Sequence, residues 1–243
     1  TPGVYFFKNA RGSTIYVVNA INLRARLRSY FLDTGLAPKT MALMKEATAL
    51  DWKLCESEAD ALIQESEYIK KHHPKFNILM RDDKQYAYVI ITKEDFPRII
   101  ITHQPSRFEK GGEHKARNIV GPFTEVGGLR TILKMLRRVF PYCTCKSPHV
   151  GRCLNEKIGR CFGFCCEKNK PHTKADIATY KKSIDSIRKI LEGKNTAIAR
   201  ALEKEMTTLS KKHYYEEAAR VRDQFFALKK IFEHRPIIRR ELT

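Results

Sequence analysis

Three residues near the start of the chain carry side chains suited to phosphate chemistry. Tyr16 lies near the end of one predicted strand, and Arg26 and Tyr30 lie one helical turn apart on the helix that follows. A planar guanidinium can brace phosphate oxygens, and a tyrosine hydroxyl can hold or move a proton. Tyrosines on strands and arginines on basic helices are also ordinary surface features, so the residue types alone leave both interpretations open.

A fourth candidate, Glu65, lies on a predicted helix one residue away from an apolar stripe that includes Ala61, Leu62 and Ile69. A carboxylate that is partly buried among aliphatic side chains is costly unless it meets a cation. Glu65 is therefore a candidate ligand for one divalent metal ion, and oxygen ligands suit hard cations such as Mg²⁺ or Mn²⁺. The alternative is a solvated glutamate on the helix surface.

The elements that must position these residues are short. Val4–Lys8 and Thr14–Asn19 are rich in β-forming residues and flank a turn at residues 9–12, which predicts a hairpin. A helix should begin near Asn22, with Leu23 and Leu27 facing a core.

The next elements follow from breaks in the pattern. Residues 38–50 are predicted to form a helix after a Gly-Leu-Ala-Pro break, and residues 51–56 a strand that places Trp52 and Cys55 in the core. Ser57 has the spacing of a helix cap for the segment that carries Glu65, and this helix must end before Pro74.

The overall charge indicates a polyanionic partner. The 243 residues contain 46 Lys and Arg against 27 Asp and Glu, a formal charge of +19, so nucleic acid is the first expectation. Solvation of a basic surface is the alternative. We expect no membrane association and a cytoplasmic location, because no apolar run approaches the roughly 18 residues of a membrane span. Since the first residue is Thr1, we expect a fragment of a longer chain.

Six of the seven cysteines fall between residues 143 and 166, which in a basic cytosolic protein favours metal over disulfides. Cys145, Cys153, Cys161 and Cys165 are separated by seven, seven and three residues. Four thiolates can surround Zn²⁺ or an iron–sulfur cluster, and the spacing does not choose between the two. We interpret Cys143 and Cys166 as bystanders, with substitution of either one as a ligand as the alternative.

A second basic element lies between the candidate residues for phosphate chemistry and the cysteines. Residues 126–140 are predicted to form an amphipathic helix after two β-rich runs at 86–92 and 99–102. Its polar side carries four cations that are candidates for contact with a DNA backbone: Arg130, Lys134, Arg137 and Arg138. A solvated surface is the alternative.

The C-terminal part is predicted to be helical, with one helix over residues 174–191 and a long segment over 196–232 that breaks near His213. The last helix offers more apolar surface than a two-helix hairpin can bury, which indicates a protein partner. The candidate contact residues are Tyr215, Ala218, Ala219, Val221, Phe225 and Leu228. Packing onto the rest of this chain is the alternative.

Four blocks of the sequence resemble the UvrC family of excinucleases. They are GVY with YVV and NLRARLRSYF, then ADALIQESEYIKKHHPKFNILMRDDK, the cysteine-rich segment with its GRC element, and the helical segment MTTLSKKHYYEEAARVRDQFF. The first two blocks resemble the GIY-YIG nuclease signature, and the last resembles the UVR motif.

The resemblance implies roles for particular residues. It makes Tyr16 the general base and Glu65 the metal ligand, with Arg26 on the phosphate. It adds Tyr5, Tyr30 and Asn77 to the catalytic set. For the four cysteines it implies a [4Fe-4S] cluster. It also implies UvrB as the partner of the UVR motif, and damaged double-stranded DNA, cut 3′ to the lesion during nucleotide excision repair, as the substrate.

The chain departs from the family after the second tyrosine of the signature. Where the family has a glycine followed by a lysine, this chain has Val18 and Asn19. Glycine gives room for close backbone approach, and the lysine charge could lower the pKa of a tyrosine. This departure leaves two hypotheses. The chain is either a metal-dependent DNA endonuclease or a cleavage-deficient scaffold that binds DNA and UvrB.

We expect an α+β fold in three parts. Residues 1–83 form a GIY-YIG nuclease domain with an antiparallel sheet flanked by helices. Residues 84–172 form a β-rich and cysteine-rich region that binds DNA and metal. Residues 173–243 form a helical region with the UVR motif at about 203–235.

Overall fold

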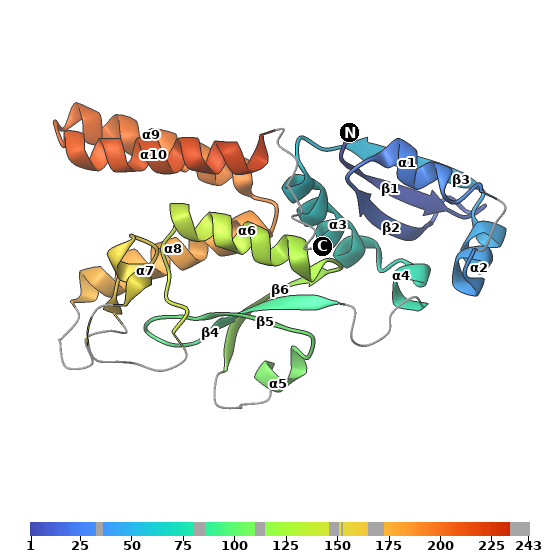
Figure 1. The fold of residues 1–243 in the computed structure, drawn as a ribbon, viewed down its shortest axis with the longest axis horizontal. Helices are drawn as coiled ribbons and strands as arrows, with labels where there is room; N and C mark the ends of the chain where they lie inside the picture. Colours follow the sequence, from blue (N-terminus) through green and yellow to red (C-terminus); the bar gives the residue numbers. More distant parts are fainter. Residues whose placement is uncertain are drawn as a thin grey trace. The chain divides into compact units, whose positions relative to one another are not determined.

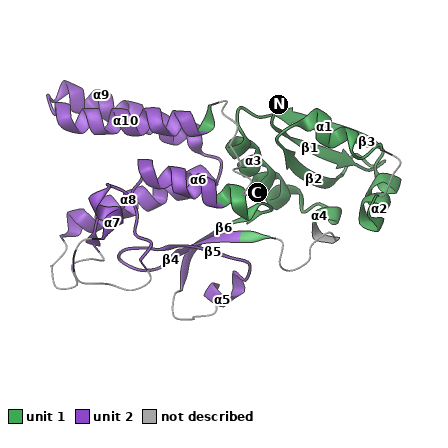
Figure 2. Ribbon diagram, viewed as in Figure 1, with its two compact units in different colours: residues 1–87, 121–129, 232–243 green, residues 88–120, 130–231 purple. Residues whose placement is uncertain are grey.

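The computed structural model describes residues 1–32, 36–79, 86–109, 115–145, 151, 153–164 and 173–233. It is a mixed α+β structure with two small sheets and helices (Figure 1), as the sequence predicts. The chain divides into two compact units (Figure 2). One comprises Thr1–Ala87, Gly121–Leu129 and Phe232–Thr243, and the other comprises Tyr88–Val120 and Arg130–Ile231.

The sheet of the first unit is built on the predicted hairpin. β1 (Gly3–Lys8) pairs antiparallel with β2 (Thr14–Ala20) on one side and with β3 (Ala49–Leu54) on the other. The Asn9 side chain accepts hydrogen bonds from the backbone N–H groups of Arg11 and Ser13, which closes the turn. The fold requires glycine at position 3, because a Cβ there would lie 2.5 Å from the Lys53 carbonyl oxygen.

Helices cover this sheet and carry three of the candidate residues, Arg26, Glu65 and Asn77. They are α1 (Leu23–Arg28), α2 (Pro38–Glu46), α3 (Glu58–His72) and α4 (Lys75–Leu79). The Asn22 side chain caps α1 and the Ser57 side chain caps α3, which confirms both predicted starts. One apolar cluster contains Tyr5, Phe7, Ile15, Ala20, Leu23, Tyr30, Leu43 and Phe76. A second contains Val4, Val17, Cys55, Ala61 and Ile69, so alternate residues of β1 enter different clusters.

Two predictions for the first unit are wrong. Trp52 is 59% exposed, not part of the core, because β3 lies at the edge of the sheet and most of its side chains face solvent. The helix predicted over residues 38–50 ends at Glu46, because Ala47 is already extended and the Thr48 N–H pairs with the Lys8 carbonyl. The buried position of Cys55 is confirmed.

The second sheet has the order β5-β4-β6. β4 (Ala87–Thr92) and β5 (Ile99–Thr102) form an antiparallel pair, and β6 (Ala116–Phe123) lies on the other side of β4. Short helix α5 (Ser106–Glu109) precedes β6, and α6 (Val126–Val139) follows it with nearly the predicted bounds. The fully buried Leu129, Ile132 and Leu136 form the apolar side of α6.

The described part of the cysteine-rich segment contains short helix α7 (Leu154–Lys157) and an aromatic cluster. The rings of Phe96, Phe162 and Phe164 surround the fully buried Tyr180. The Tyr180 hydroxyl donates to the Pro97 carbonyl and accepts from the backbone N–H of residue 143. One tyrosine on a later helix therefore joins the second sheet to the cysteine-rich segment.

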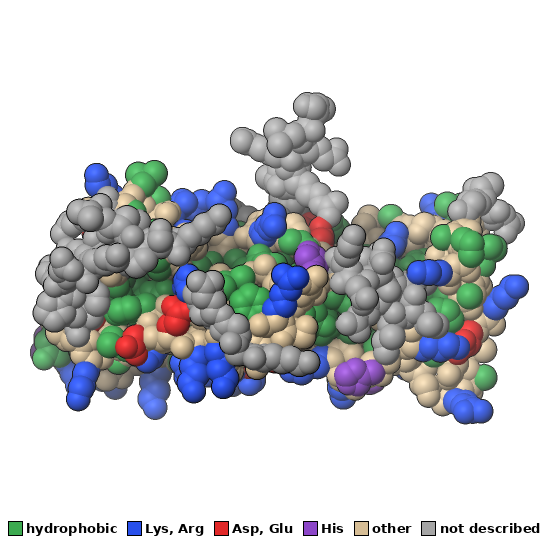
Figure 3. Space-filling model, turned by 90° about the horizontal axis from the view of Figure 1, so that it is seen from below, with side chains coloured by type: hydrophobic (Ala, Val, Ile, Leu, Met, Phe, Trp, Pro, Cys, Tyr) green, Lys and Arg blue, Asp and Glu red, His purple; other side chains and the backbone are tan. Residues whose placement is uncertain are grey.

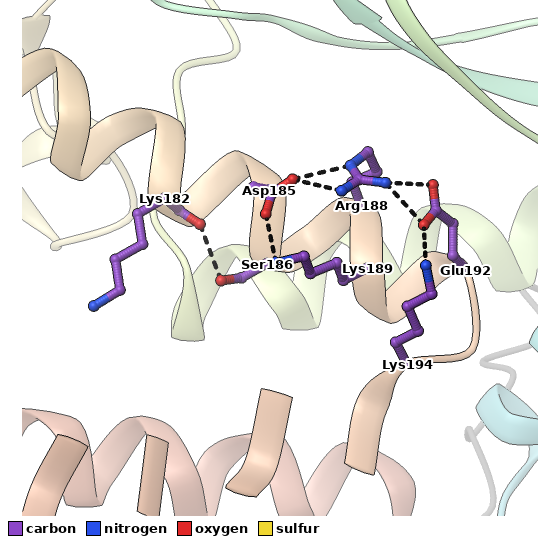
Figure 4. A network of polar contacts seen from close by, with 7 residues as sticks. All are labelled: Lys182, Asp185, Ser186, Arg188, Lys189, Glu192 and Lys194. Carbon is purple, nitrogen blue, oxygen red and sulfur yellow. Dashed lines mark hydrogen bonds and ion pairs between the residues drawn. The ribbon is translucent and has the colours of Figure 1, made fainter. Parts of the chain in front are cut away.

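The C-terminal helices are α8 (Lys174–Leu191), α9 (Asn195–Lys211) and α10 (Tyr215–Phe232). Residue 213 has a φ of 63°, which confirms the predicted break between α9 and α10. Arg188 bridges Asp185 and Glu192 along the surface of α8 (Figure 4). Such exposed pairs contribute little to stability individually. Within the described residues, no helix is both long and apolar enough to cross a membrane.

Candidate active site

Glu65 is completely buried on α3, which excludes the solvated alternative. Its Oε2 atom accepts hydrogen bonds from the Asn19 side-chain amide at 2.7 Å and the Thr124 hydroxyl at 2.6 Å. Its Oε1 atom is buried and has no hydrogen-bond partner among the described residues. Burial raises the pKa of Glu65 to about 7, although the donors from Thr124 and Asn19 act in the opposite direction.

The unpaired Oε1 atom fits a cation ligand. A buried carboxylate oxygen without a hydrogen-bond partner costs free energy, and native structures rarely contain one. In the described part of the chain, no three His, Cys, Asp or Glu side chains gather as a metal site. A divalent cation here would therefore use Glu65 as its protein ligand and complete its shell with water and phosphate oxygens, as Mg²⁺ commonly does.

A cluster of tyrosines and one arginine lies beside the hairpin. The hydroxyls of Tyr5 and Tyr30 share a hydrogen bond of 2.8 Å, and the Arg26 guanidinium lies 5.6 Å from the centre of the Tyr30 ring. Burial raises the pKa of Tyr5, and the neighbouring Tyr30 raises it further. Tyr5 is fully buried, so it orients Tyr30 and does not face a substrate directly.

Tyr16 joins this cluster to the carboxylate. Burial raises its pKa, and so does Tyr30, whereas the Arg26 charge lowers it and the Glu65 charge raises it. The Tyr16 hydroxyl is thus within electrostatic reach of both Arg26 and Glu65. The structure brings together one carboxylate, one exposed arginine and a half-buried tyrosine, which are distant along the sequence.

The side-chain amide of Asn77 is bound to the backbone of Val17. Its side-chain oxygen accepts from the Val17 N–H at 2.8 Å, and its side-chain nitrogen donates to the Val17 carbonyl at 2.7 Å. Both ends of the amide are therefore occupied, and the side chain is buried. Asn77 fixes the backbone of β2 between Tyr16 and Val18.

The described cysteines do not form the predicted set. Cys145 and Cys153 are half-buried, and Cys161 is buried. Cys161 contacts Cys143, which the sequence analysis interprets as a bystander. This contact and burial both raise the pKa of the Cys161 thiol. Cys165 lies outside the described residues. The described thiols do not gather as a metal site, so they do not support the cluster.

The predicted DNA-contacting residues on α6 separate into two groups. Arg130, Lys134 and Arg137 line one pocket of the second unit, whereas Arg138 is exposed and does not line it. In the view of Figure 3, Lys and Arg side chains are frequent on the surface and Asp and Glu side chains are few. Such a surface suits a polyanion.

The hairpin of α9 and α10 buries part of the surface assigned to a partner. Ala218, Val221 and Leu228 are buried within this chain, and Ala219 and Phe225 are half-buried. The alternative of packing onto the chain itself is therefore correct for three residues of the set. Tyr215 remains 64% exposed, and the exposed Tyr214 and Phe226 extend the apolar surface beyond the predicted residues.

Sequence reasoning missed the two donors to Glu65. It treated Asn19 only as the loss of a lysine, and it did not consider Thr124. No local sequence pattern pointed to Thr124, which directly follows Gly121-Pro122-Phe123.

Comparison with known proteins gives matches along the chain. Residues 1–78 match a UvrC-like GIY-YIG domain, residues 86–189 match the middle domain of UvrC/Cho excinucleases, and residues 196–231 match the UvrB/UvrC motif. The UvrABC system protein C of Moorella thermoacetica is 38% identical over 237 residues, which cover 96% of this chain and 36% of the relative. That of Nitrosomonas europaea is 36% identical over 236 residues, with 96% and 37% covered.

Among solved structures, the GIY-YIG N-terminal endonuclease domain of UvrC from Thermotoga maritima, bound to its catalytic magnesium, is 41% identical. The alignment covers 31% of this chain and 82% of that one, with a TM-score of 0.29. The chain spans a little over a third of the length of the curated relatives it matches. Because the three family matches follow one another along almost its whole length, the chain belongs to the UvrC family.

Proposed function

We propose that this chain is the part of a nucleotide excision repair protein that cuts DNA, by metal-dependent hydrolysis of a phosphodiester. The observation that carries the proposal is the Glu65 carboxylate. It is completely buried, it is held through one oxygen, and the other oxygen has no partner. A hard divalent cation supplies what that oxygen lacks.

The residues around Glu65 fit distinct tasks in this reaction. When bound, Mg²⁺ or Mn²⁺ supplies a positive charge that acidifies water and offsets the charge developing on the phosphate. Arg26 is exposed and braces the non-bridging oxygens of the phosphodiester. Tyr30, oriented by its hydrogen bond with Tyr5, lies beside the Arg26 guanidinium.

Tyr16 is proposed as the general base. Burial keeps its hydroxyl protonated at neutral pH in the metal-free chain, so Tyr16 would have to release its own proton to solvent before it could accept a proton from the attacking water. Loss of its proton is favoured by the Arg26 guanidinium and opposed by the Glu65 carboxylate. Asn77 keeps Tyr16 in place through the backbone of Val17.

The alternative of a cleavage-deficient scaffold is not favoured. Its basis was the replacement of glycine and lysine by Val18 and Asn19. Asn19 donates a hydrogen bond to Glu65 at 2.7 Å, so it takes part in holding the metal ligand. The hydrogen bond from Asn19 lowers the pKa of the Glu65 carboxyl group and favours the charged form, which is the form that binds a cation.

The proposed substrate is damaged double-stranded DNA, cut 3′ to the lesion, and the proposed partner is a UvrB-type protein at the exposed part of the hairpin. The charge of +19 and the match to the UvrB/UvrC motif support both. We place the protein in the cytoplasm. The [4Fe-4S] cluster at Cys145, Cys153, Cys161 and Cys165 stays a prediction from the resemblance, with Zn²⁺ as the alternative, and no step of the reaction uses it. A broad visible absorbance of the purified chain would distinguish the two.

A nicking assay tests the proposal. The chain, a UvrB-type protein, a duplex with one lesion and Mg²⁺ should give a nick 3′ to the lesion. Glu65→Gln should reduce the rate by about 100-fold or more, since it removes the charged ligand. Glu67→Gln, which removes an exposed carboxylate from the same helix, is the matched control and should cut normally. Equal rates for the two variants would refute the role of Glu65.

A further inference from the structure

A pocket of about 350 Å³ lies within the second unit, between β5, α6 and the segment after α6. Four cationic side chains line it. Arg130, Lys134 and Arg137 come from α6, and Arg160 comes from the cysteine-rich segment. Arg160 was not among the predicted contacts with DNA. The pocket therefore gathers positive charge from two parts of the sequence.

These cations are not neutralised within the described part of the chain. None of the four forms an ion pair with a carboxylate there, whereas Arg98 and Arg188, also in the second unit, each do. Like charges gathered around one pocket repel one another unless an anion joins them. The pocket thus lacks an anionic partner among the described residues.

Arg137 is the most firmly held of the four. Its Nε–H donates to the carbonyl oxygens of Tyr142 at 2.9 Å and of Arg160 at 3.0 Å. Its guanidinium lies 5.3 Å from the centre of the Tyr142 ring. Its Nη2 atom is buried and has no acceptor in the described residues. A guanidinium fixed in this way loses little conformational entropy when it binds a phosphate.

Apart from Thr144, the rest of the lining is aliphatic or aromatic, and it includes Tyr142. Ile99 and Ile101 come from β5, and Leu133, which is 5% exposed, comes from α6. A pocket that served only a phosphate would not need an aliphatic floor. A volume of this size lies at the lower end of the range for small-molecule sites, roughly 300–1,000 Å³. The combination suits a ligand with one charged end and one flat apolar part.

We propose that this pocket binds one unpaired nucleotide of single-stranded DNA. The phosphate lies against Arg137 and the neighbouring cations, and the base enters over Ile99, Ile101 and Leu133. Proteins that bind single strands combine a basic track with apolar or aromatic surfaces for the bases. The bases of a duplex are paired and stacked and do not enter such a pocket without being extruded. Nucleotide binding here does not depend on cleavage, so it can be tested in a variant that lacks Glu65.

The test is fluorescence anisotropy with a labelled single-stranded oligonucleotide and the full chain that carries Glu65→Gln. We expect the added double substitution Arg130→Gln and Lys134→Gln to weaken binding at least about tenfold and to lower the salt slope by about 0.7 for each lost phosphate contact. Both side chains are exposed, so the fold should be kept. The double substitution Arg200→Gln and Lys204→Gln, which removes two exposed cations of α9 that do not line the pocket, is the matched control and should bind almost normally.

Two further probes test the nucleotide itself. An abasic oligonucleotide of the same length should bind more weakly, because it has no base for the apolar floor. Ile101→Ala should reduce the difference in affinity between the normal and the abasic oligonucleotide without changing the salt dependence of binding. The proposal is overturned if the pocket double variant and the α9 double variant behave alike, or if the abasic strand binds as well as the normal one. Failure of the nicking assay would leave these outcomes unchanged.

Discussion

At the scale of the residue, the chemistry of this chain centres on a carboxylate that the fold buries and only half satisfies. Asn19 and Thr124 hold Oε2 of Glu65, while Oε1 has no partner. Thr124 lies outside residues 1–78, which match the GIY-YIG domain, and inside the match to the middle domain. The candidate site therefore includes a residue from beyond the nuclease match.

Thr124→Val should weaken cation binding. The valine has nearly the shape of threonine but removes a hydrogen bond to a charged group, worth about 1.5–3 kcal/mol, or roughly tenfold or more in affinity. Because Thr124 lowers the pKa of Glu65, the variant should also need a higher pH for half-maximal Mn²⁺ binding. Titration calorimetry with Mn²⁺ measures both effects. Thr124→Ser keeps the hydroxyl and should bind normally, and equal losses in both variants would argue against the hydrogen bond.

Glu65 should also make the stability of the metal-free chain depend on pH. Its folded pKa of about 7 is above its ordinary value of 4.5, so the folded state binds the proton more tightly than the unfolded state does. The resulting stabilisation is fully present below about pH 4.5, is lost as the pH rises and is gone above about pH 7. The loss should be on the order of 3 kcal/mol.

Urea unfolding at pH 5 and pH 8 in the presence of a chelator measures this effect. Glu65→Gln has no such titration, so the wild-type chain should lose more free energy of unfolding between the two pH values than this variant. Identical losses would show that the carboxyl group does not carry a raised pKa.

At the scale of the element, the sequence predicts those helices and strands whose pattern is local. The hairpin at residues 3–20, α3 and α6 follow from alternation, caps and helical periodicity, and the structure confirms them. Trp52 was misplaced because burial of a strand residue depends on whether the strand lies at the edge of the sheet. Thr124 was missed because its partner is 59 residues away, and no local pattern records such a contact.

The hairpin of α9 and α10 allows stability and partner binding to be separated. Leu228→Ala removes a buried side chain and should cost about 2–5 kcal/mol of unfolding free energy. Tyr215→Ala changes an exposed residue and should cost less than about 0.5 kcal/mol, while weakening binding to a UvrB-type protein. Urea unfolding and a pull-down with that partner check the two variants. If both variants still bind the partner at low temperature, this face of the hairpin is not the binding surface.

At the scale of the whole molecule, positive charge is the common feature of both units. With 46 basic and 27 acidic residues, the chain should bind DNA with a strong dependence on salt. The first unit adds a buried carboxylate with one unpaired oxygen, and the second adds a basic pocket with an apolar floor. Hydrolysis and nucleotide binding can therefore be measured separately in one chain.

The most direct test of the proposed metal site is the number of Mn²⁺ ions bound per chain, measured by electron paramagnetic resonance of free Mn²⁺ near pH 8. We predict one ion for the wild-type chain and for Glu67→Gln, and loss of this ion in Glu65→Gln. Undiminished Mn²⁺ binding by Glu65→Gln would contradict the proposed site, because it would separate the cation from the one buried carboxylate oxygen of α3 that the described structure leaves without a partner.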